Sequence, residues 1–221
     1  MRKALKVVCF DLDGLLVNTE PYYYESTRLV WEKLGAVMEK EYYARNWIIR
    51  GTSIEAELEK FGIKADSARV REELRTIFAR MVEEKLDLMP CAKEVASLAH
   101  DLFTTVLVTN TPREQAERTV ARAGLRDYLH HMVTRELYQK AKPNPDCYLA
   151  AMRIAGCSSD ECLAFEDSPR GVRAAFDAGV TCIAVVHELT RYEPPEGAAM
   201  VLDSLAELDL KDVSAKWPLR R

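Results

Sequence analysis

Asp11 directly follows the first apolar run of the chain, and Asp13 comes two residues later, before Gly14. Two carboxylates in one cleft can divide the work of phosphoryl transfer, because one attacks phosphorus as a nucleophile while the other gives and takes a proton. The two anions repel each other, and a divalent cation with oxygen ligands would relieve that repulsion. A plain acidic turn is the alternative interpretation of the same D-x-D-G pattern.

The element that must position these acids is the apolar run from Lys6 to Phe10, which has the composition of a buried parallel strand. In open α/β sheets the reactive groups gather at the carboxyl ends of the strands. The position of Asp11 at the end of this run therefore predicts that its side chain faces a cleft, which Asp13 can share.

A second predicted strand, from Thr104 to Val108, is followed by Thr109 and Asn110. The segment T-P-R-E that begins at Thr111 has the pattern of a capping box, so we expect Thr111 to cap a helix that opens directly after the strand. Free backbone N–H groups at such a helix start bind phosphate, and the Thr109 hydroxyl and the Asn110 amide can add donors. Ordinary structural capping is the alternative.

Lys142 lies in the segment K-A-K-P-N-P, where two prolines stiffen a predicted loop. A lysine fixed in this way could neutralise both a phosphate and the Asp11 carboxylate. A lysine on a solvated loop would do neither, and the residue pattern alone leaves both interpretations open.

A further apolar run, from Cys162 to Phe165, ends in Glu166 and Asp167. Acids that follow a buried strand can again face the cleft, so one or both could complete an oxygen cage for Mg²⁺ with Asp11. The alternative is that Asp167 only caps the next helix.

The composition excludes several classes of function. The chain has 221 residues, 48% of them hydrophobic, and a net charge of −4 without a basic stripe, so we do not expect a nucleic-acid partner. The apolar stretch near the amino terminus is too short for a signal peptide or a membrane span, which predicts a cytoplasmic protein with no membrane partner. Six cysteines without C-x-x-C spacing are expected to be reduced, and zinc is not expected.

The helical pattern of residues 17–88 contrasts with the alternating strands and helices that follow. We therefore predict an α/β fold: a Rossmann-like, doubly wound parallel sheet formed by residues 1–16 and 89–221, with an inserted α-helical cap at residues 17–88. A cap in this place could close over the cleft and exclude water. A helical bundle that only adds core is the alternative.

The four strand-end motifs D-x-D-G, T-N, K-P and E-D-S jointly resemble the haloacid dehalogenase superfamily, in the branch that carries a helical cap. The run FEDSPRGVRAAFDAG is especially similar to the phosphatase and phosphoglucomutase members, and the resemblance extends from about Val7 to Leu205. A non-catalytic binding protein that shares this fold is an alternative from another class, which the gathered acids argue against because packing gives no reason to bring unpaired carboxylates together.

The resemblance implies a role for each motif. Asp11 would be the nucleophile that forms an aspartyl phosphate, and Asp13 the acid that protonates the leaving oxygen and then activates water. Thr109 and Asn110 would hold the transferred phosphoryl group, and Lys142 would steady its charge and that of the nucleophile. This distribution of roles agrees with phosphoryl transfer, which depends mainly on positioning and charge neutralisation.

The resemblance also implies a Mg²⁺ cofactor. Asp11, Asp13 through its carbonyl oxygen, and Asp167 would bind the cation, with Glu166 in support. The dehalogenases that gave the superfamily its name lack the second acid and the metal, so Asp13 disfavours carbon–halogen cleavage.

Within this superfamily the sequence favours a phosphoric monoester hydrolase over a phosphomutase. The similar mutases carry a cap histidine where this chain has Tyr23, and a cap K-G-x-S-R where it reads R-G-T-S-I from Arg50. We expect a small phosphomonoester as substrate, of the sugar phosphate or phosphoglycolate type, contacted by Tyr22, Tyr23, Trp47 and Arg50 of the cap. A monomer or weak homodimer is expected, and β-phosphoglucomutase-like activity is the alternative.

Overall fold

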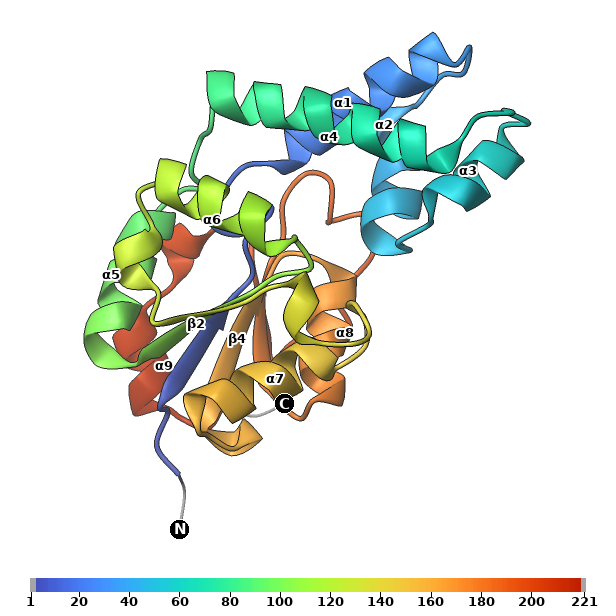
Figure 1. Ribbon diagram of the computed structural model, residues 1–221. Helices are drawn as coiled ribbons and strands as arrows, with labels where there is room; N and C mark the ends of the chain where they lie inside the picture. Colours follow the sequence, from blue (N-terminus) through green and yellow to red (C-terminus); the bar gives the residue numbers. More distant parts are fainter. Residues whose placement is uncertain (1–2, 220–221) are drawn as a thin grey trace.

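The computed structural model describes residues 3–219, and its centre is a six-stranded parallel sheet in the order β3-β2-β1-β4-β5-β6 (Figure 1). The strands are β1 (Val7–Phe10), β2 (Thr104–Val108), β3 (His131–Val133), β4 (Cys162–Glu166), β5 (Thr181–Val185) and β6 (Met200–Leu202). The strand order reverses where β1 and β4 lie side by side. In doubly wound sheets this switch point opens a crevice at the carboxyl ends of the strands.

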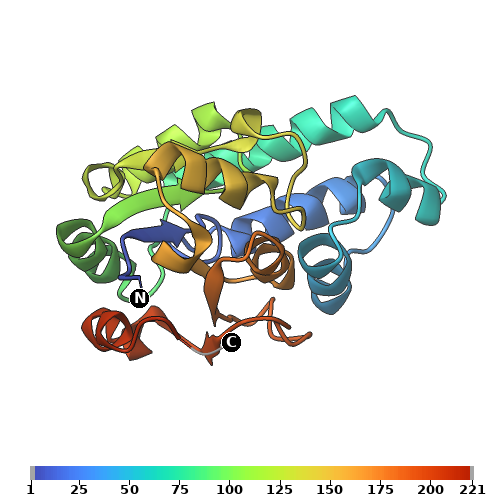
Figure 2. The same cartoon turned by 90° about the horizontal axis from the view of Figure 1, so that it is seen from below.

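Helices cover both faces of the sheet, because successive side chains of a strand point to opposite sides. Val8 and Phe10 belong to one hydrophobic cluster, and Val7 and Cys9 belong to the other. The first cluster includes residues of α5 (Ala92–Leu102), α6 (Arg113–Arg122) and α9 (Leu210–Ala215), and the second includes residues of α7 (Asp146–Ala155) and α8 (Pro169–Asp177). Figure 2 shows α7, in gold, and α9, in red, on opposite sides of the sheet.

Four helices and a π-helical turn lie beyond the carboxyl ends of the strands and form the cap (Figure 1). They are α1 (Glu20–Lys33), α2 (Lys40–Tyr43), the π-helical η1 (Ala44–Ile49), α3 (Ile54–Lys60) and α4 (Ser67–Glu84). The cap has a hydrophobic cluster of its own around the buried Trp31. The two segments that join it to the sheet pair with each other, since Val17 bridges Leu88 and the Met89 N–H donates to the Leu16 carbonyl at 3.0 Å.

Local signals explain where several helices begin. The side chains of Ser53, Asp66 and Ser168 accept hydrogen bonds from backbone N–H groups at the starts of α3, α4 and α8. Short 3₁₀ turns connect other elements: η2 (Arg126–Tyr128), η3 (Arg135–Leu137), η4 (Ser159–Glu161) and η5 (Leu205–Glu207). None of the helices between residues 3 and 219 has the length and apolar content to span a bilayer.

The α/β fold with a Rossmann-like parallel sheet is confirmed, and one local expectation is wrong. Thr111 does not cap α6: the N-cap residue is Pro112, and the Arg113 N–H at the start of the helix donates to the Glu136 carboxylate at 3.0 Å. The Thr111 hydroxyl instead donates to the Asp13 carboxylate. Within the cap, α2 passes directly into the π-helical η1 after Tyr43.

Candidate active site

The carboxyl ends of β1 and β4 bring the predicted acids together. The two strands are in register, with Phe10 opposite Phe165, and the Asp11 N–H donates to the Phe165 carbonyl at 3.1 Å. Asp11 therefore lies beside Glu166 and Asp167 at the switch point of the sheet, as the strand-end argument predicts. All three carboxylates are buried.

Lys142 is at the centre of this group, with only 4% of its surface exposed. Its Nζ lies 2.5 Å from Asp11 Oδ1 and 2.5 Å from Glu166 Oε1, and it donates to the Val108 carbonyl at 2.8 Å. Burial alone would lower the pKa of this ammonium, but the charges of Asp11 and Glu166 outweigh that effect and raise the pKa well above its usual value. The solvated interpretation of Lys142 is wrong.

Glu166 is enclosed on every side and holds Lys142 in place. Its Oε1 accepts from the Tyr148 hydroxyl as well as from Lys142, while Oε2 has no hydrogen-bond partner within residues 3–219. A Cβ on Gly171 would lie only 1.8 Å from Oε2, so α8 packs directly against this carboxylate. Burial raises the pKa of Glu166, and the neighbouring ammonium of Lys142 opposes that rise.

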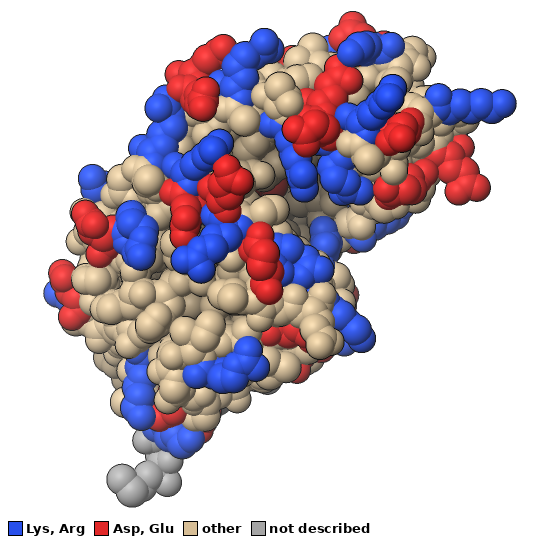
Figure 3. Space-filling view, viewed as in Figure 1, with Lys and Arg blue, Asp and Glu red and all other residues tan. Residues whose placement is uncertain are grey.

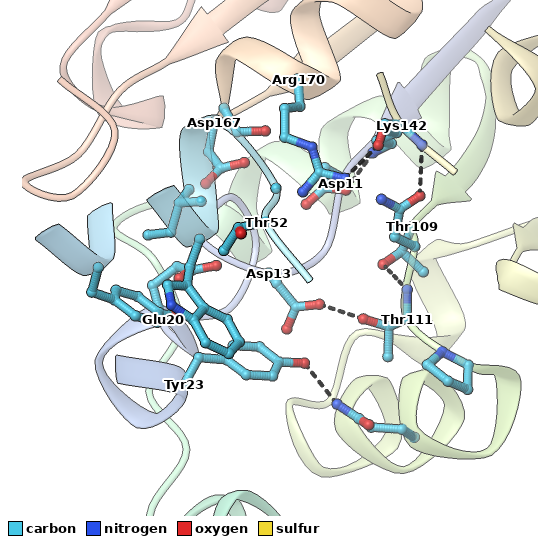
Figure 4. A pocket seen from close by; sticks show the side chains of 18 of the residues that line it. Asp11, Asp13, Glu20, Tyr23, Thr52, Thr109, Thr111, Lys142, Asp167 and Arg170 are labelled. Atoms are coloured by element: carbon cyan, nitrogen blue, oxygen red, sulfur yellow. Dashed lines mark hydrogen bonds and ion pairs between the residues drawn. The ribbon is translucent and has the colours of Figure 1, made fainter. Parts of the chain in front are cut away.

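Asp13 is held differently from Asp11, by hydroxyl groups instead of an ammonium. The Thr19 hydroxyl donates to Asp13 Oδ1 and the Thr111 hydroxyl donates to Oδ2, both at 2.6 Å. Burial raises the pKa of Asp13, and the two hydroxyl hydrogen bonds partly offset this rise because they favour the ionised form. Such a carboxyl group is suited to exchanging a proton, and Figure 4 shows it facing the same cavity as Asp11.

Three of the acids form a donor set that fits a cation. Oxygens of Asp11, Glu166 and Asp167 lie within 4.8 Å of one another, and carboxylate oxygens are the ligands that Mg²⁺ prefers. Asp167 Oδ2 lies 3.0 Å from His187 Nε2, which leaves its other oxygen for a cation. The carboxylate of Asp13 is not part of this cluster in the described chain, and its predicted contribution through the carbonyl oxygen stays a prediction.

Thr109 and Asn110 lie at the end of β2 and line the cavity, and their contact with a phosphoryl group stays a prediction. The Thr109 hydroxyl accepts from the Thr111 N–H at 3.0 Å. Asn110 Oδ1 accepts from the Tyr138 hydroxyl at 2.8 Å and from the Lys142 N–H at 3.1 Å. Because its oxygen is fixed in this way, the Asn110 amide group is the part of the side chain that can donate to a ligand.

A cavity of about 510 Å³ lies between the sheet and the cap. Figure 3 shows the hollow between the two parts of the molecule, with basic side chains gathered near it. Among the predicted cap residues, Tyr23 and Trp47 line it, whereas Tyr22 and Arg50 are not among its lining residues in the described chain. The exposed Arg50 instead donates to Asn46 Oδ1 at 3.2 Å.

Four other residues that line the cavity were not predicted from the sequence. Arg71 and Arg75 of α4, Glu20 of α1 and Arg170 of α8 all contribute to the cavity wall. Glu20 Oε2 and Arg170 Nε are buried without hydrogen-bond partners among the described residues, so both polar groups are available to a ligand. Arg170 follows the E-D-S motif by two positions, which is the signal that could have identified it.

Comparison with known proteins agrees with this geometry. Residues 8–185 match the haloacid dehalogenase-like hydrolase family. The chain belongs to this family. A phosphorylated carbohydrates phosphatase of Thermotoga maritima is 30% identical over 196 residues, which cover 84% of this chain and 87% of the relative. A β-phosphoglucomutase of Bacillus subtilis is 25% identical over 225 residues, which cover 96% of each protein.

Solved structures extend the similarity to the whole fold. The crystal structure of CbbY from Rhodobacter sphaeroides in complex with phosphate has a TM-score of 0.79 and 25% sequence identity, and the match covers 92% of this chain and 96% of that one. The membership in the haloacid dehalogenase family and the prediction of an enzyme, a hydrolase, are therefore confirmed.

Proposed function

We propose that the protein is a Mg²⁺-dependent phosphatase that hydrolyses a small phosphomonoester through an aspartyl phosphate on Asp11. The observation that carries the proposal is the pairing of two differently held carboxylates at one cavity: Asp11 lies against the Lys142 ammonium, and Asp13 is held by two hydroxyl groups. Burial raises the pKa of both carboxyls; the Lys142 ammonium opposes this at Asp11 and favours the anion that must attack, while the hydroxyl donors leave Asp13 with a raised pKa that suits proton exchange.

In the first half of the reaction an Asp11 oxygen attacks phosphorus, and the bond from phosphorus to the ester oxygen breaks. Asp13 gives its proton to that leaving oxygen, so the alcohol departs neutral. The Lys142 ammonium balances charge at Asp11, and Thr109 and Asn110 donate hydrogen bonds to the phosphoryl oxygens. When bound at Asp11 and Asp167, Mg²⁺ would neutralise phosphoryl charge and orient the group.

In the second half, Asp13 acts as a base. It accepts a proton from a water molecule as that water attacks phosphorus, and the bond from phosphorus to Asp11 breaks. The products are inorganic phosphate and the free Asp11 carboxylate, which restores the starting state. The cap above the cavity limits which waters reach the aspartyl phosphate.

The cap side of the cavity supports a small anionic substrate. Tyr23 and Trp47 present ring surfaces, and Arg71 and Arg75 add positive charge on the same face of α4. A sugar phosphate agrees with the name of the Thermotoga maritima relative, a phosphorylated carbohydrates phosphatase. Phosphoglycolate agrees with the two cap arginines, because it carries a second negative group. We propose that the enzyme works in the cytoplasm as a monomer or weak homodimer.

A phosphomutase is the second candidate, favoured by the similarity to the β-phosphoglucomutase of Bacillus subtilis. Tyr23, at the position of the mutases' cap histidine, argues against it. Its hydroxyl accepts from Gln115 at 2.7 Å, its ring stacks on Phe78, and burial raises its pKa well above the usual value. A buried phenol of this kind cannot exchange protons near neutral pH as a histidine does.

The first experiment measures phosphate release from a panel of phosphomonoesters, with and without Mg²⁺, by the wild type and by Asp11→Asn. Metal-dependent release that the variant loses is the expected result. Isomeric product from β-glucose 1-phosphate without free phosphate would favour the mutase. No turnover of any compound, together with retained Mg²⁺ binding, would favour a non-catalytic protein.

A further inference from the structure

The loop that follows β5 touches the proposed cation site through His187. Its Nε2 lies 3.0 Å from Asp167 Oδ2, and its Nδ1 accepts a hydrogen bond from the Leu189 N–H at 3.2 Å. Because Nδ1 accepts, the proton of the neutral imidazole is on Nε2, and Nε2 donates to Asp167. The loop also has an internal hydrogen bond of its backbone, since the main-chain N–H of His187 donates to the Thr190 hydroxyl at 3.0 Å.

The backbone at Gly14, in the D-x-D-G motif, packs against the hydrogen-bonded pair of His187 and Asp167. Gly14 has φ +80°, and a Cβ placed on it would lie 2.3 Å from Asp167 Oδ2 and 2.8 Å from His187 Nε2. A side chain at position 14 would therefore displace the hydrogen bond between the two residues. The absence of a Cβ lets the chain between Asp11 and Val17 pack directly against the pair.

The same loop is anchored in the cap, although it belongs to the sheet domain by sequence. Leu189 is 3% exposed and is a member of the cap's hydrophobic cluster. Glu188 forms an ion pair with Lys40 of α2 at 2.7 Å, and the ring of Tyr192 lies 5.3 Å from the Arg45 guanidinium of η1. Figure 1 shows this orange loop rising from the sheet toward the cap.

We propose that His187 is a positioning residue that orients Asp167 for the cation, and that Leu189 makes this orientation depend on the packing of the cap. The inference rests on the proposed function, because it takes Asp167 as a cation ligand. When an N–H group holds one oxygen of a carboxylate, the other oxygen keeps a fixed direction. In metal sites, mutation of such a hydrogen-bond donor commonly weakens metal affinity by about 10- to 100-fold. The cap and the cation site then respond to each other through two residues of one loop.

The role of His187 is tested by measuring cation binding instead of turnover. Mn²⁺ binding to the protein, measured by electron paramagnetic resonance in the absence of substrate, is expected to weaken about 10-fold in His187→Leu. His187→Gln retains an N–H donor of similar reach and is expected to recover most of the affinity. A structural role alone would lower the melting temperature of His187→Leu while its Mn²⁺ affinity stayed at the wild-type value, and that result would overturn the assignment.

The coupling to the cap is tested with two matched leucines. Leu189 and Leu58 are 3% and 4% exposed in the same cluster, but only Leu189 shares a loop with His187. Leu189→Ala is expected to weaken Mn²⁺ binding several-fold, and Leu58→Ala to leave it unchanged at similar loss of melting temperature. Equal Mn²⁺ affinities in the two variants would overturn the coupling.

The outcome for the wild type separates this inference from the proposed function. A wild type that releases phosphate and binds Mn²⁺, with His187→Leu binding equally well, refutes only the role of His187. A wild type that binds neither Mn²⁺ nor Mg²⁺ refutes the cation site at Asp11 and Asp167, and the inference falls with it.

Discussion

At the scale of single residues, Asp11 and Asp13 differ in the groups that stabilise their ionised forms. A buried ammonium stabilises the Asp11 carboxylate, whereas hydroxyl donors stabilise that of Asp13. A charge–charge contact in a buried site acts more strongly on the ionised state than a neutral donor does. Burial raises the pKa of both carboxyls, so what distinguishes the two acids is the kind of partner each has, an ammonium for Asp11 and two hydroxyl groups for Asp13.

Removing one hydroxyl donor from Asp13 is expected to shift the pH dependence of catalysis. In Thr111→Val the ionised form of Asp13 loses a hydrogen bond of about 1.5 kcal/mol, which raises its pKa by about 1 unit. Because the first step needs protonated Asp13, the alkaline limb of kcat/KM should move to higher pH by about that amount. The measurement is a pH profile of kcat/KM, with Thr119→Val, a buried threonine outside the cavity lining, as the control. An unshifted limb would argue against Asp13 as the acid.

Lys142 is expected to contribute to folding as well as to chemistry. Lys142→Met leaves Asp11 and Glu166 buried without their cation, which should lower the free energy of unfolding by about 3 kcal/mol at neutral pH. Burial already raises the pKa of both carboxyls, and losing the ammonium raises them further. At pH 8 the folded variant must bury ionised carboxylates, whereas at pH 5 it can bury them protonated. The loss of unfolding free energy should therefore be smaller at pH 5 than at pH 8.

Urea unfolding at the two pH values measures this difference. Lys140→Met, an exposed lysine of the same loop, is the matched control and should change little. A Lys142→Met protein whose stability loss was the same at both pH values would contradict the burial of unpaired carboxylates as its cause.

At the scale of elements, the sequence predicts the parts that depend on local pattern. The strand ends at Asp11, Thr109 and Glu166 follow from apolar runs that stop at polar residues, and parallel pairing brings them to one edge. The use of the Thr111 hydroxyl could not be predicted, because its partner Asp13 is 98 residues away in sequence and local pattern favours a cap. The contact of His187 with Asp167 was missed for the same reason.

The cap helix α4 carries a prediction about substrate binding. Arg71 and Arg75 line the cavity, and their acidic neighbours Glu55 and Glu72 only partly neutralise them, at 3.2 and 3.9 Å. Replacing both arginines with glutamine should raise KM for an anionic substrate about fivefold and leave kcat nearly unchanged, since exposed charges contribute modestly. Added salt should shrink this difference.

Steady-state kinetics at low and high salt test the role of α4. Arg80→Gln on the same helix is the control, because Arg80 is exposed and does not line the cavity in the described chain. If the double variant kept the wild-type KM at low salt, the two arginines would not attract the substrate.

At the scale of the whole molecule, cap and sheet domain meet tightly at Gly51. This residue has φ +66°, and a Cβ on it would lie 2.5 Å from the Arg170 guanidinium carbon. Arg170 also donates to the Lys142 carbonyl, so its side chain cannot move away without losing a hydrogen bond. The absence of a side chain at position 51 therefore lets the cap approach the cavity wall.

Gly51→Ala is expected to displace Arg170 and to raise KM several-fold. Gly35→Ala is the matched control in the cap, because Gly35 has φ +82° but no described atom lies within 4 Å of its added Cβ. Both variants bear the strain of about 1 kcal/mol of a left-handed alanine, and only the first meets a neighbour. In an Arg170→Ala background the KM effect of Gly51→Ala should largely disappear, giving a coupling of about 1 kcal/mol in a double-mutant cycle. Additive effects would mean that Gly51 acts on the cap alone and that the approach to Arg170 does not shape the cavity.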